Sequence, residues 1–221
     1  MMEKKWEFKL NSPNIWLTAD LHFSHQNVIK HCPNRAINGI FDINDIKAHD
    51  EWLIKKWNNT IKKTDIVYII GDFCFANREE TIKLLGKLNG NKHLILGNHD
   101  KSSDHLFNYF KSISQIKEVK FKQQHYPFLK EDFDVIMCHY HMINWNRKHY
   151  GSVEVCGHSH GRLDDYNLST PDLRVDVGID GKLANYDFIS LEKLYKFFKE
   201  KTEGKLFADY AREKKDENML I

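Results

Sequence analysis

The chain has 221 residues, of which 41% are hydrophobic and 13% aromatic, which is enough to fold around one substantial core. Its 33 basic and 31 acidic residues leave a net charge of +2, which argues against strong attraction to nucleic acid duplexes or membrane surfaces. No apolar run approaches the ~20 residues that span a bilayer, and the N-terminus lacks the apolar segment of a secretion signal. We therefore predict a single cytoplasmic domain over 1–221, with a core at about 14–190 and a C-terminal helical segment at 191–221.

In the first half of the chain, short apolar runs bounded by Gly, Asn or Asp alternate with segments of helical periodicity. Strands are predicted at 14–20, 65–72 and 93–98. Helices are predicted between them, over 44–61 and within 78–90. This alternation predicts an α/β fold in which the first sheet is largely parallel.

In the second half, the predicted strands follow one another without long helices between them. They cover 133–139, 152–158 and 173–179, which suggests a second sheet with antiparallel pairs. A helix is predicted over 190–201, with a serine at its start as the N-cap. The highly charged tail, 203–221, is predicted to form a final helix.

The four cysteines show no CxxC spacing and do not indicate a disulfide framework. They indicate free thiols in a reducing compartment. Cys138 and Cys156 each stand within a predicted strand, directly before a residue of interest, so their side chains should point to the opposite face and into the core.

Residues suited to metal binding or acid–base chemistry stand at the end of five of the predicted strands. Ligands bind at this edge of open α/β sheets. In the first strand we expect Asp20 and His22 to share a face, because residues i and i+2 do so in a strand. The full set of predicted metal ligands is Asp20, His22, Asp72, Asn98, His139, His158 and His160.

This mixture of carboxylate, amide and imidazole ligands suits borderline divalent ions better than Ca²⁺ or Mg²⁺. We predict Mn²⁺, with Fe, Zn, Co or Ni as alternatives. Seven ligands are too many for one ion and suit two. A centrally placed carboxylate such as Asp72 could bridge two ions ~3.5–4 Å apart, which is the spacing of hydrolytic two-metal sites.

The order of these motifs, "DLH", "GD", "GNHD", "H" and "GHSH", resembles that of the calcineurin-like metallophosphoesterase family over about 14–190. The stretch "RVDVGIDG" with "YDFISLEKL" is similar to the closing strand and helix of that family. The resemblance implies a four-layer αββα sandwich with two mixed β-sheets, and a dinuclear metal site at the C-terminal ends of the strands. It also implies hydrolysis of a phosphate ester by attack of a metal-bridging hydroxide.

The resemblance also assigns roles within the motifs. Asp20, His22 and His160 would hold one ion and Asp72 would bridge. The second ion would be held by the remaining ligands, Asn98, His139 and His158.

Catalytic and substrate-binding roles are predicted for residues beside the ligands. The resemblance implies that His99 assists the leaving group, as a histidine can near pH 7. Asp100 could orient His99, although a capping or ion-pair role is equally plausible. His25, Arg35 and Arg162 are predicted to bind substrate, the arginines because their forked donors suit phosphate. His25 and His141 fall outside the motifs, and we expect neither to bind metal.

For the substrate we predict a small-molecule or nucleotide phosphoester, most simply a phosphodiester of nucleotide type. The motifs contain no arginine to balance the second charge of a monoester, and Tyr140, Trp145 and Tyr150 could stack a base. The alternatives are a phosphomonoesterase on the same centre and a non-catalytic scaffold that binds a protein partner. A metallo-β-lactamase would need an HxHxDH cluster, which "HSHGRL" lacks, and an HD-domain protein would place "HD" on a helix. The sequence carries no signal for an oligomeric state.

Overall fold

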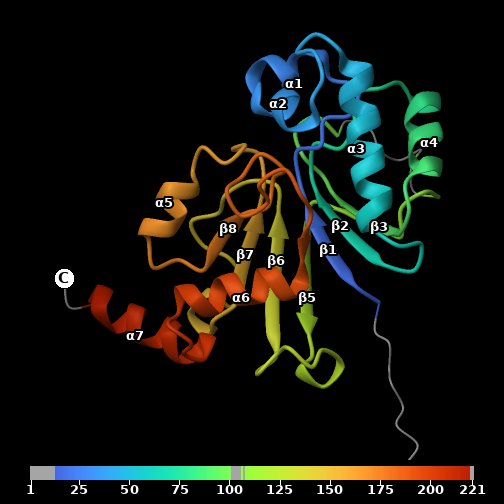
Figure 1. The fold of residues 1–221 in the computed structure, drawn as a ribbon. Helices are drawn as coiled ribbons and strands as arrows, with labels where there is room; N and C mark the ends of the chain where they lie inside the picture. Colours follow the sequence, from blue (N-terminus) through green and yellow to red (C-terminus); the bar gives the residue numbers. More distant parts are fainter. Residues whose placement is uncertain (1–12, 101–105, 107, 220–221) are drawn as a thin grey trace, which may run out of the picture.

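Two β-sheets pack against each other in the computed structural model, which describes residues 13–100, 106 and 108–219 (Figure 1). The strands are β1 (Ile15–Thr18), β2 (Ile66–Ile70), β3 (Asn91–Ile95), β4 (Ser112–Ser114), β5 (Ile116–Phe121), β6 (Phe133–Cys138), β7 (Val153–Cys156), β8 (Arg174–Asp176) and β9 (Ile189–Ser190). The α-helices are α1 (Gln26–His31), α2 (Asn34–Gly39), α3 (Ile46–Thr60), α4 (Arg78–Lys87), α5 (Asp164–Ser169), α6 (Leu191–Lys201) and α7 (Phe207–Met219). Two 3₁₀ turns complete the set, η2 (Gln123–His125) and η3 (Lys148–Tyr150).

The first sheet has the order β4-β3-β2-β1-β9, with the first four strands parallel and β9 antiparallel. Alternate residues of its strands face opposite ways. Leu17 and Tyr68 belong to the core between the two sheets. Val67 and Ile69 belong to the core on the other face, where Trp57 of α3 is buried. The prediction of a largely parallel first sheet flanked by helices is confirmed.

The second sheet has the order β5-β6-β7-β8, and only the β5–β6 pair among these is antiparallel. The prediction of antiparallel pairs is therefore wrong for β6–β7 and β7–β8. The connections between these strands contain only the short η3 and α5, but they are long enough to carry the chain back for a parallel crossover. Strands β4 and β5 were not predicted, since they lie in a segment interpreted as a loop.

Helix α6 follows β9 directly and contacts β1, while its Tyr195 and Phe198 rings pack against Phe133 of β6 in the second sheet. Helix α7 follows α6. Ser190 caps α6 as predicted, with its hydroxyl accepting from the backbone N–H of Lys193. Phe198, Phe207 and Tyr210 are buried in the core between the sheets. The predicted final helix exists, and its first turns are part of the packed protein. Within the described part of the chain, no helix has the length and apolar character that crossing a membrane requires.

The arrangement is an αββα sandwich, as the resemblance implied. Strands β1, β2 and β3 are parallel, so their carboxyl ends meet at one edge of the first sheet, and β6 and β7 are parallel in the second sheet. The segments that follow these strands contain all the predicted metal ligands. The fold therefore brings the motifs together at the adjoining edges of the two sheets.

Candidate metal centre

The backbone at the ends of the strands is strained in a way that the sequence did not reveal. Strand β1 ends at Thr18, so Asp20 and His22 lie beyond it, and the prediction that they share a strand face is wrong. Their φ angles are 56° and 51°, in the left-handed region. Five of the seven predicted ligands adopt such positive φ values: Asp20, His22, Asp72, His158 and His160. Each costs of order 1–3 kcal/mol in a non-glycine residue, and such strain clusters at functional sites.

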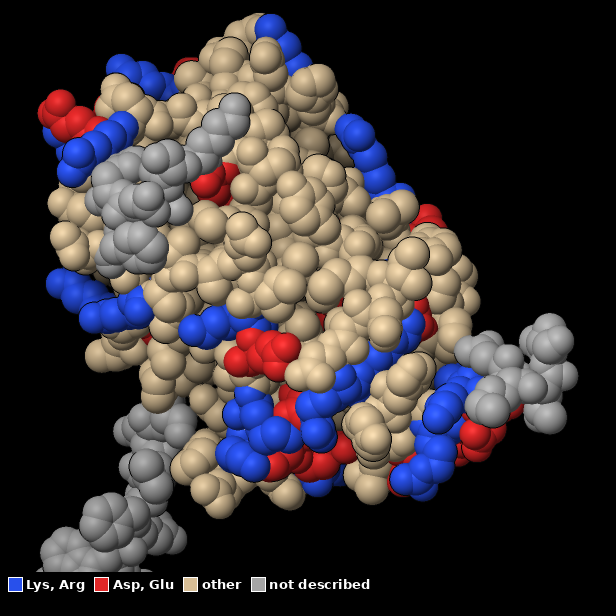
Figure 2. All heavy atoms as spheres, turned by 180° about the vertical axis from the view of Figure 1, so that it is seen from behind, with Lys and Arg blue, Asp and Glu red and all other residues tan. Residues whose placement is uncertain are grey.

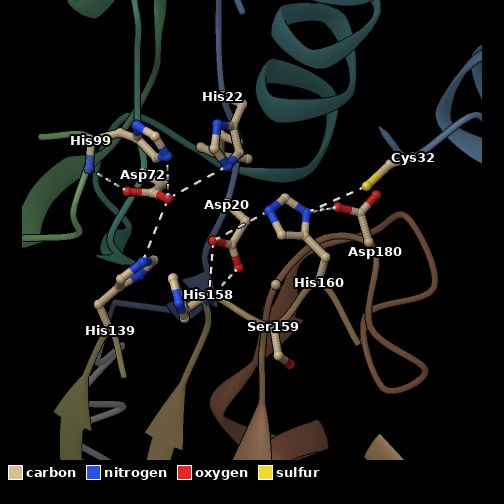
Figure 3. Close-up of polar contacts among 12 residues, drawn as sticks. Asp20, His22, Cys32, Asp72, His99, His139, His158, Ser159, His160 and Asp180 are labelled. Carbon is tan, nitrogen blue, oxygen red and sulfur yellow. Dashed lines mark hydrogen bonds and ion pairs between the residues drawn. The ribbon is translucent and has the colours of Figure 1, made fainter. Parts of the chain in front are cut away.

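One group of potential ligands consists of Asp20, His22 and His160, whose ligand atoms all lie within 4.8 Å of one another (Figure 3). Asp20 and His22 are buried. The His22 Nε2 atom is fully buried without a hydrogen-bond partner, and it points toward the Asp72 carboxylate at 3.5 Å. A buried imidazole nitrogen without a partner is costly unless a ligand satisfies it. A metal ion held by this group would satisfy it.

The second group consists of Asp72, His139 and His158, again within 4.8 Å (Figure 3). The amide oxygen of Asn98 lies 3.1 Å from His139 Nε2, so Asn98 faces this group. The Asp72 Oδ2 atom is 3.5 Å from His139 Nε2 and 3.5 Å from His22 Nε2. One carboxylate oxygen is therefore shared between the two groups, which is the position that a bridging ligand needs.

Two glycines let the backbone pack closely against the side chains of Asp72 and His139. A Cβ atom at Gly97 would lie 2.3 Å from Asp72 Oδ1, and one at Gly71, where φ is +85°, would lie 2.2 Å from His139 Nδ1. No other residue fits at these two positions without displacing a ligand. The chemistry of the donors, their spacing and the unsatisfied His22 nitrogen all fit a pair of divalent ions.

Burial and neighbouring charges shift the pKa values of the side chains in both groups. Burial raises the pKa of Asp20 to about 7, and burial together with the charge of Arg35 lowers the pKa of His22 to about 2. Burial acts to raise the pKa of Asp72 also, but the hydrogen bond and the charge of His139 outweigh it and lower that pKa to about 2. A bound cation would stabilise the carboxylate of Asp20 beside neutral imidazoles, which is the protonation state that metal binding requires.

Hydrogen bonds to the Nδ1 atoms determine which nitrogen of two ligand histidines is available. The Nδ1–H of His139 donates to the carbonyl oxygen of Ile70 at 2.9 Å. His160 Nδ1 lies 2.7 Å from Asp180 Oδ2, and the Cys32 Sγ atom is 3.5 Å from the same nitrogen. Burial acts to lower the pKa of His160, but the hydrogen bonds to Asp180 and Cys32 outweigh it and raise that pKa to about 10. Both arrangements leave Nε2 facing the centre, as metal-binding histidines do.

Arg35 does not face substrate, contrary to the prediction. Its side chain is fully buried, and its Nε and Nη2 atoms donate to the Asp180 carboxylate at 2.8 and 2.5 Å. Nη2 and Nη1 also donate to the backbone carbonyls of Asp20 and Leu21. Arg35 thus connects the segment after β1 to the segment after β8. The sequence could not show this, because the partners are 145 residues apart.

The carboxylate of Asp100 binds backbone groups and has no hydrogen bond to the ring of His99 among the described contacts. Its two oxygens accept from the backbone N–H groups of Asp72, Phe73 and Gly97 at 2.8–2.9 Å. This carboxylate ties the end of β2 to the end of β3. It therefore positions the backbone of Asp72, while His99 is held separately, by its own N–H to Asp72 Oδ1 at 3.0 Å.

Aromatic rings border the two groups. His25 lies beside the centre, with its Nδ1 3.2 Å from His22 Nδ1. Its ring stacks on Phe75 with centroids 3.8 Å apart and an interplanar angle of 5°. Phe75 also contacts His99, at 4.6 Å between centroids. If the Nε2 atom of His22 binds a metal ion, the proton of this imidazole is on Nδ1, which would then donate to His25. For Phe75, the sequence contained no signal except its position three residues after Asp72.

The other predicted substrate residues lie in different places. Arg162 is exposed on the turn after His160. Tyr140 contacts the rings of His139 and His158, but Trp145 is buried, with its Nε1 donating to the carbonyl oxygen of Ser152. The Tyr150 ring lies beside the guanidinium of Arg147. The prediction that Trp145 stacks a base is therefore wrong.

Asp176 and Asp180 are the residues that sequence reasoning overlooked, although both lie in the quoted stretch "RVDVGIDG". Asp176 is buried and accepts from the Ser159 hydroxyl and from the N–H groups of Gly161 and Gly178. It therefore supports the turn that carries His158 and His160. The signal in the sequence was the presence of two acidic residues within an otherwise apolar run, where buried carboxylates need partners.

An αββα sandwich with two adjoining groups of carboxylate and imidazole ligands has the architecture of a metal-dependent hydrolase. A family model described as calcineurin-like phosphoesterase matches residues 13–217. An uncharacterized protein of Methanocaldococcus jannaschii is 30% identical over 187 residues, which cover 82% of this chain and 89% of that protein. The gene 66 protein of Mycobacterium phage L5 is 26% identical over 201 residues, or 80% of this chain and 92% of its own.

The solved structure of a protein of unknown function from Aquifex aeolicus has the same fold, with a TM-score of 0.60 and 22% identity over 84% of this chain and 100% of that one. The chain belongs to the calcineurin-like phosphoesterase family. It is accordingly a metal-dependent hydrolase of phosphoesters.

Proposed function

We propose that this protein is a dinuclear phosphodiesterase, active with Mn²⁺, that hydrolyses phosphodiesters of nucleotide type. Asp20, His22 and His160 hold one ion and Asn98, His139 and His158 the other, while Asp72 bridges them. The observation that carries the proposal is the position of Asp72 Oδ2, at 3.5 Å from a histidine nitrogen of each group. When bound, two ions supply Lewis acidity for the phosphoryl group and lower the pKa of a coordinated water.

His99 protonates the leaving oxygen. Its side chain is 39% exposed, so it can reach a bound ester, and its Nε2 lies 4.0 Å from Asp72 Oδ2 at the border of the centre. Its backbone is held by Asp72, and its ring is packed against Phe75, so the imidazole is positioned without being a ligand. An imidazole positioned in this way can act as a general acid.

The preference for diesters follows from the charge near the centre. A monoester dianion needs cationic groups in addition to the metals, whereas a diester has a single charge. Arg35 does not supply such a group, since Asp180 neutralises it within the protein. The molecular face in Figure 2 is mostly uncharged, and in its lower part the basic side chains lie beside acidic ones. The described residues on this face therefore form no large basic surface for a nucleic acid duplex. A small nucleotide ester fits these observations better than a duplex.

The test is a comparison of kcat/KM for bis-(4-nitrophenyl) phosphate and 4-nitrophenyl phosphate, with the protein loaded in turn with Mn²⁺, Fe²⁺, Zn²⁺, Co²⁺ and Ni²⁺. We expect the diester to be preferred and Mn²⁺ to be most effective. A monoester preference of tenfold or more would replace this proposal with a phosphomonoesterase. A protein that binds both ions but hydrolyses neither ester would be the non-catalytic scaffold.

The four free thiols support a cytoplasmic location.

A further inference from the structure

A cavity of about 430 Å³ opens beside the second metal group and has no role in the site described above. It lies where the ends of β3 and β6 meet the turn between β4 and β5. Asn98 and Tyr140 form part of its wall. Asn98 also faces His139 at 3.1 Å, and the Tyr140 ring contacts the rings of His139 and His158 at 5.1 and 5.0 Å. The cavity therefore adjoins the proposed metal centre.

The wall of the cavity combines apolar side chains with a few polar groups. Tyr140 and Ile116 both line the cavity, and their side chains are 46% and 51% exposed. Two large, mainly apolar side chains are therefore exposed to solvent within a concave part of the surface. Among the described residues that line it there is no Lys or Arg. Its one carboxylate, Asp100, already accepts three backbone N–H groups. The exposed amide of Gln115 adds one donor group and one acceptor to the rim.

We propose that this cavity is the binding site for the nucleobase of the ester, a proposal that rests on the function proposed above. A phosphoryl group at the metal centre would leave the organic part of the ester beside Asn98. A second phosphate is disfavoured there, because the described residues that line the cavity include no cation to pair with it. A flat uncharged ring fits, since Tyr140 offers a face for stacking and Ile116 an apolar contact. Gln115 can then hydrogen-bond the edge of the base.

The kinetic test uses two diesters with the same leaving group, thymidine 5′-(4-nitrophenyl phosphate) and methyl 4-nitrophenyl phosphate. We expect the wild-type protein to prefer the nucleoside ester at least tenfold in kcat/KM. Tyr140→Ala should reduce this preference about tenfold, within the range reported for loss of one base–aromatic stack. Ile116→Ala, on the exposed face of β5, should reduce it in the same direction. The control is Tyr166→Ala, which removes a similarly exposed tyrosine from α5 and should preserve the preference.

Calorimetry separates this proposal from the proposed function. The Mn²⁺-loaded protein is titrated with thymidine 5′-monophosphate and with inorganic phosphate, which has no base to place in the cavity. Tyr140→Ala should weaken binding of the nucleotide about tenfold more than binding of phosphate. If neither ester is hydrolysed, the proposed function is wrong, yet this titration still tests the cavity. Equal weakening of both ligands, or an unchanged preference in Tyr140→Ala and Ile116→Ala, would overturn the nucleobase site.

Discussion

Replacing Asp180 by asparagine tests how the fold controls His160. In the native structure, the Asp180 carboxylate accepts from His160 Nδ1 (Figure 3). The same carboxylate accepts from two nitrogens of Arg35. Asn is almost the same size, but only its oxygen accepts. If that oxygen retains the hydrogen bonds from Arg35, the amide NH₂ group faces His160 Nδ1, which must then accept a hydrogen bond. The proton of the imidazole would move to Nε2, the nitrogen that faces the metal group.

The expected loss is 10–100-fold in affinity for the ion held by Asp20, His22 and His160, the usual effect of removing a carboxylate that orients a metal-binding histidine. The ion held near His139 should be affected much less, because the Nδ1–H of that residue donates to a backbone carbonyl. Asp180→Asn should also cost ~3–5 kcal/mol in the free energy of unfolding, because it leaves the charge of buried Arg35 without its carboxylate.

The assay is calorimetric titration of metal-free protein with Mn²⁺, together with ¹⁵N NMR of the imidazoles, which distinguishes the two tautomers. The control is Asp165→Asn, which alters an exposed carboxylate that pairs with Lys182 and should change neither readout. The reasoning is refuted if both sites weaken equally, or if His160 keeps its proton on Nδ1 in the folded variant.

The bridging role of Asp72 predicts that Asp72→Asn loses affinity at both metal sites, as measured by metal analysis; loss of one ion alone would contradict it. His99→Ala should keep both ions but lower kcat by ~10²–10⁴, with a smaller loss for nitrophenyl esters, whose leaving group needs no proton; equal losses for good and poor leaving groups would argue against a general acid. Burial raises the pKa of Glu154 to about 8 from 4.5, so the folded protein retains a proton that the unfolded chain releases. The free energy of unfolding should therefore fall as pH rises from about 4.5 to about 8, and Glu154→Gln should flatten that slope in urea denaturation; an equal slope in both proteins would show that Glu154 ionises normally.

The ends of the strands could be predicted from the sequence, because a buried strand is a short apolar run and the polar residues after it stand out. This pattern placed Asp72, His139 and His158 at one edge, where the structure has them. It also predicted that Cys138 and Cys156 are buried, which is confirmed. Strands β4 and β5 were missed because the alternation in β5 is between exposed and half-buried positions, a weak signal at the edge of a sheet.

What the sequence by itself determined is the set of chemically active residues and the order in which the fold presents them, since both depend on patterns within a few residues. Only the tertiary structure decided which partner each residue has. Arg35 has a side chain suited to binding phosphate, but it pairs with Asp180 inside the protein. Asp100 follows His99 in the sequence, but its carboxylate binds the backbone N–H groups of Asp72 and Phe73. Such partners come from segments that are far apart in the chain, and their pairing depends on packing distances that no local spacing encodes.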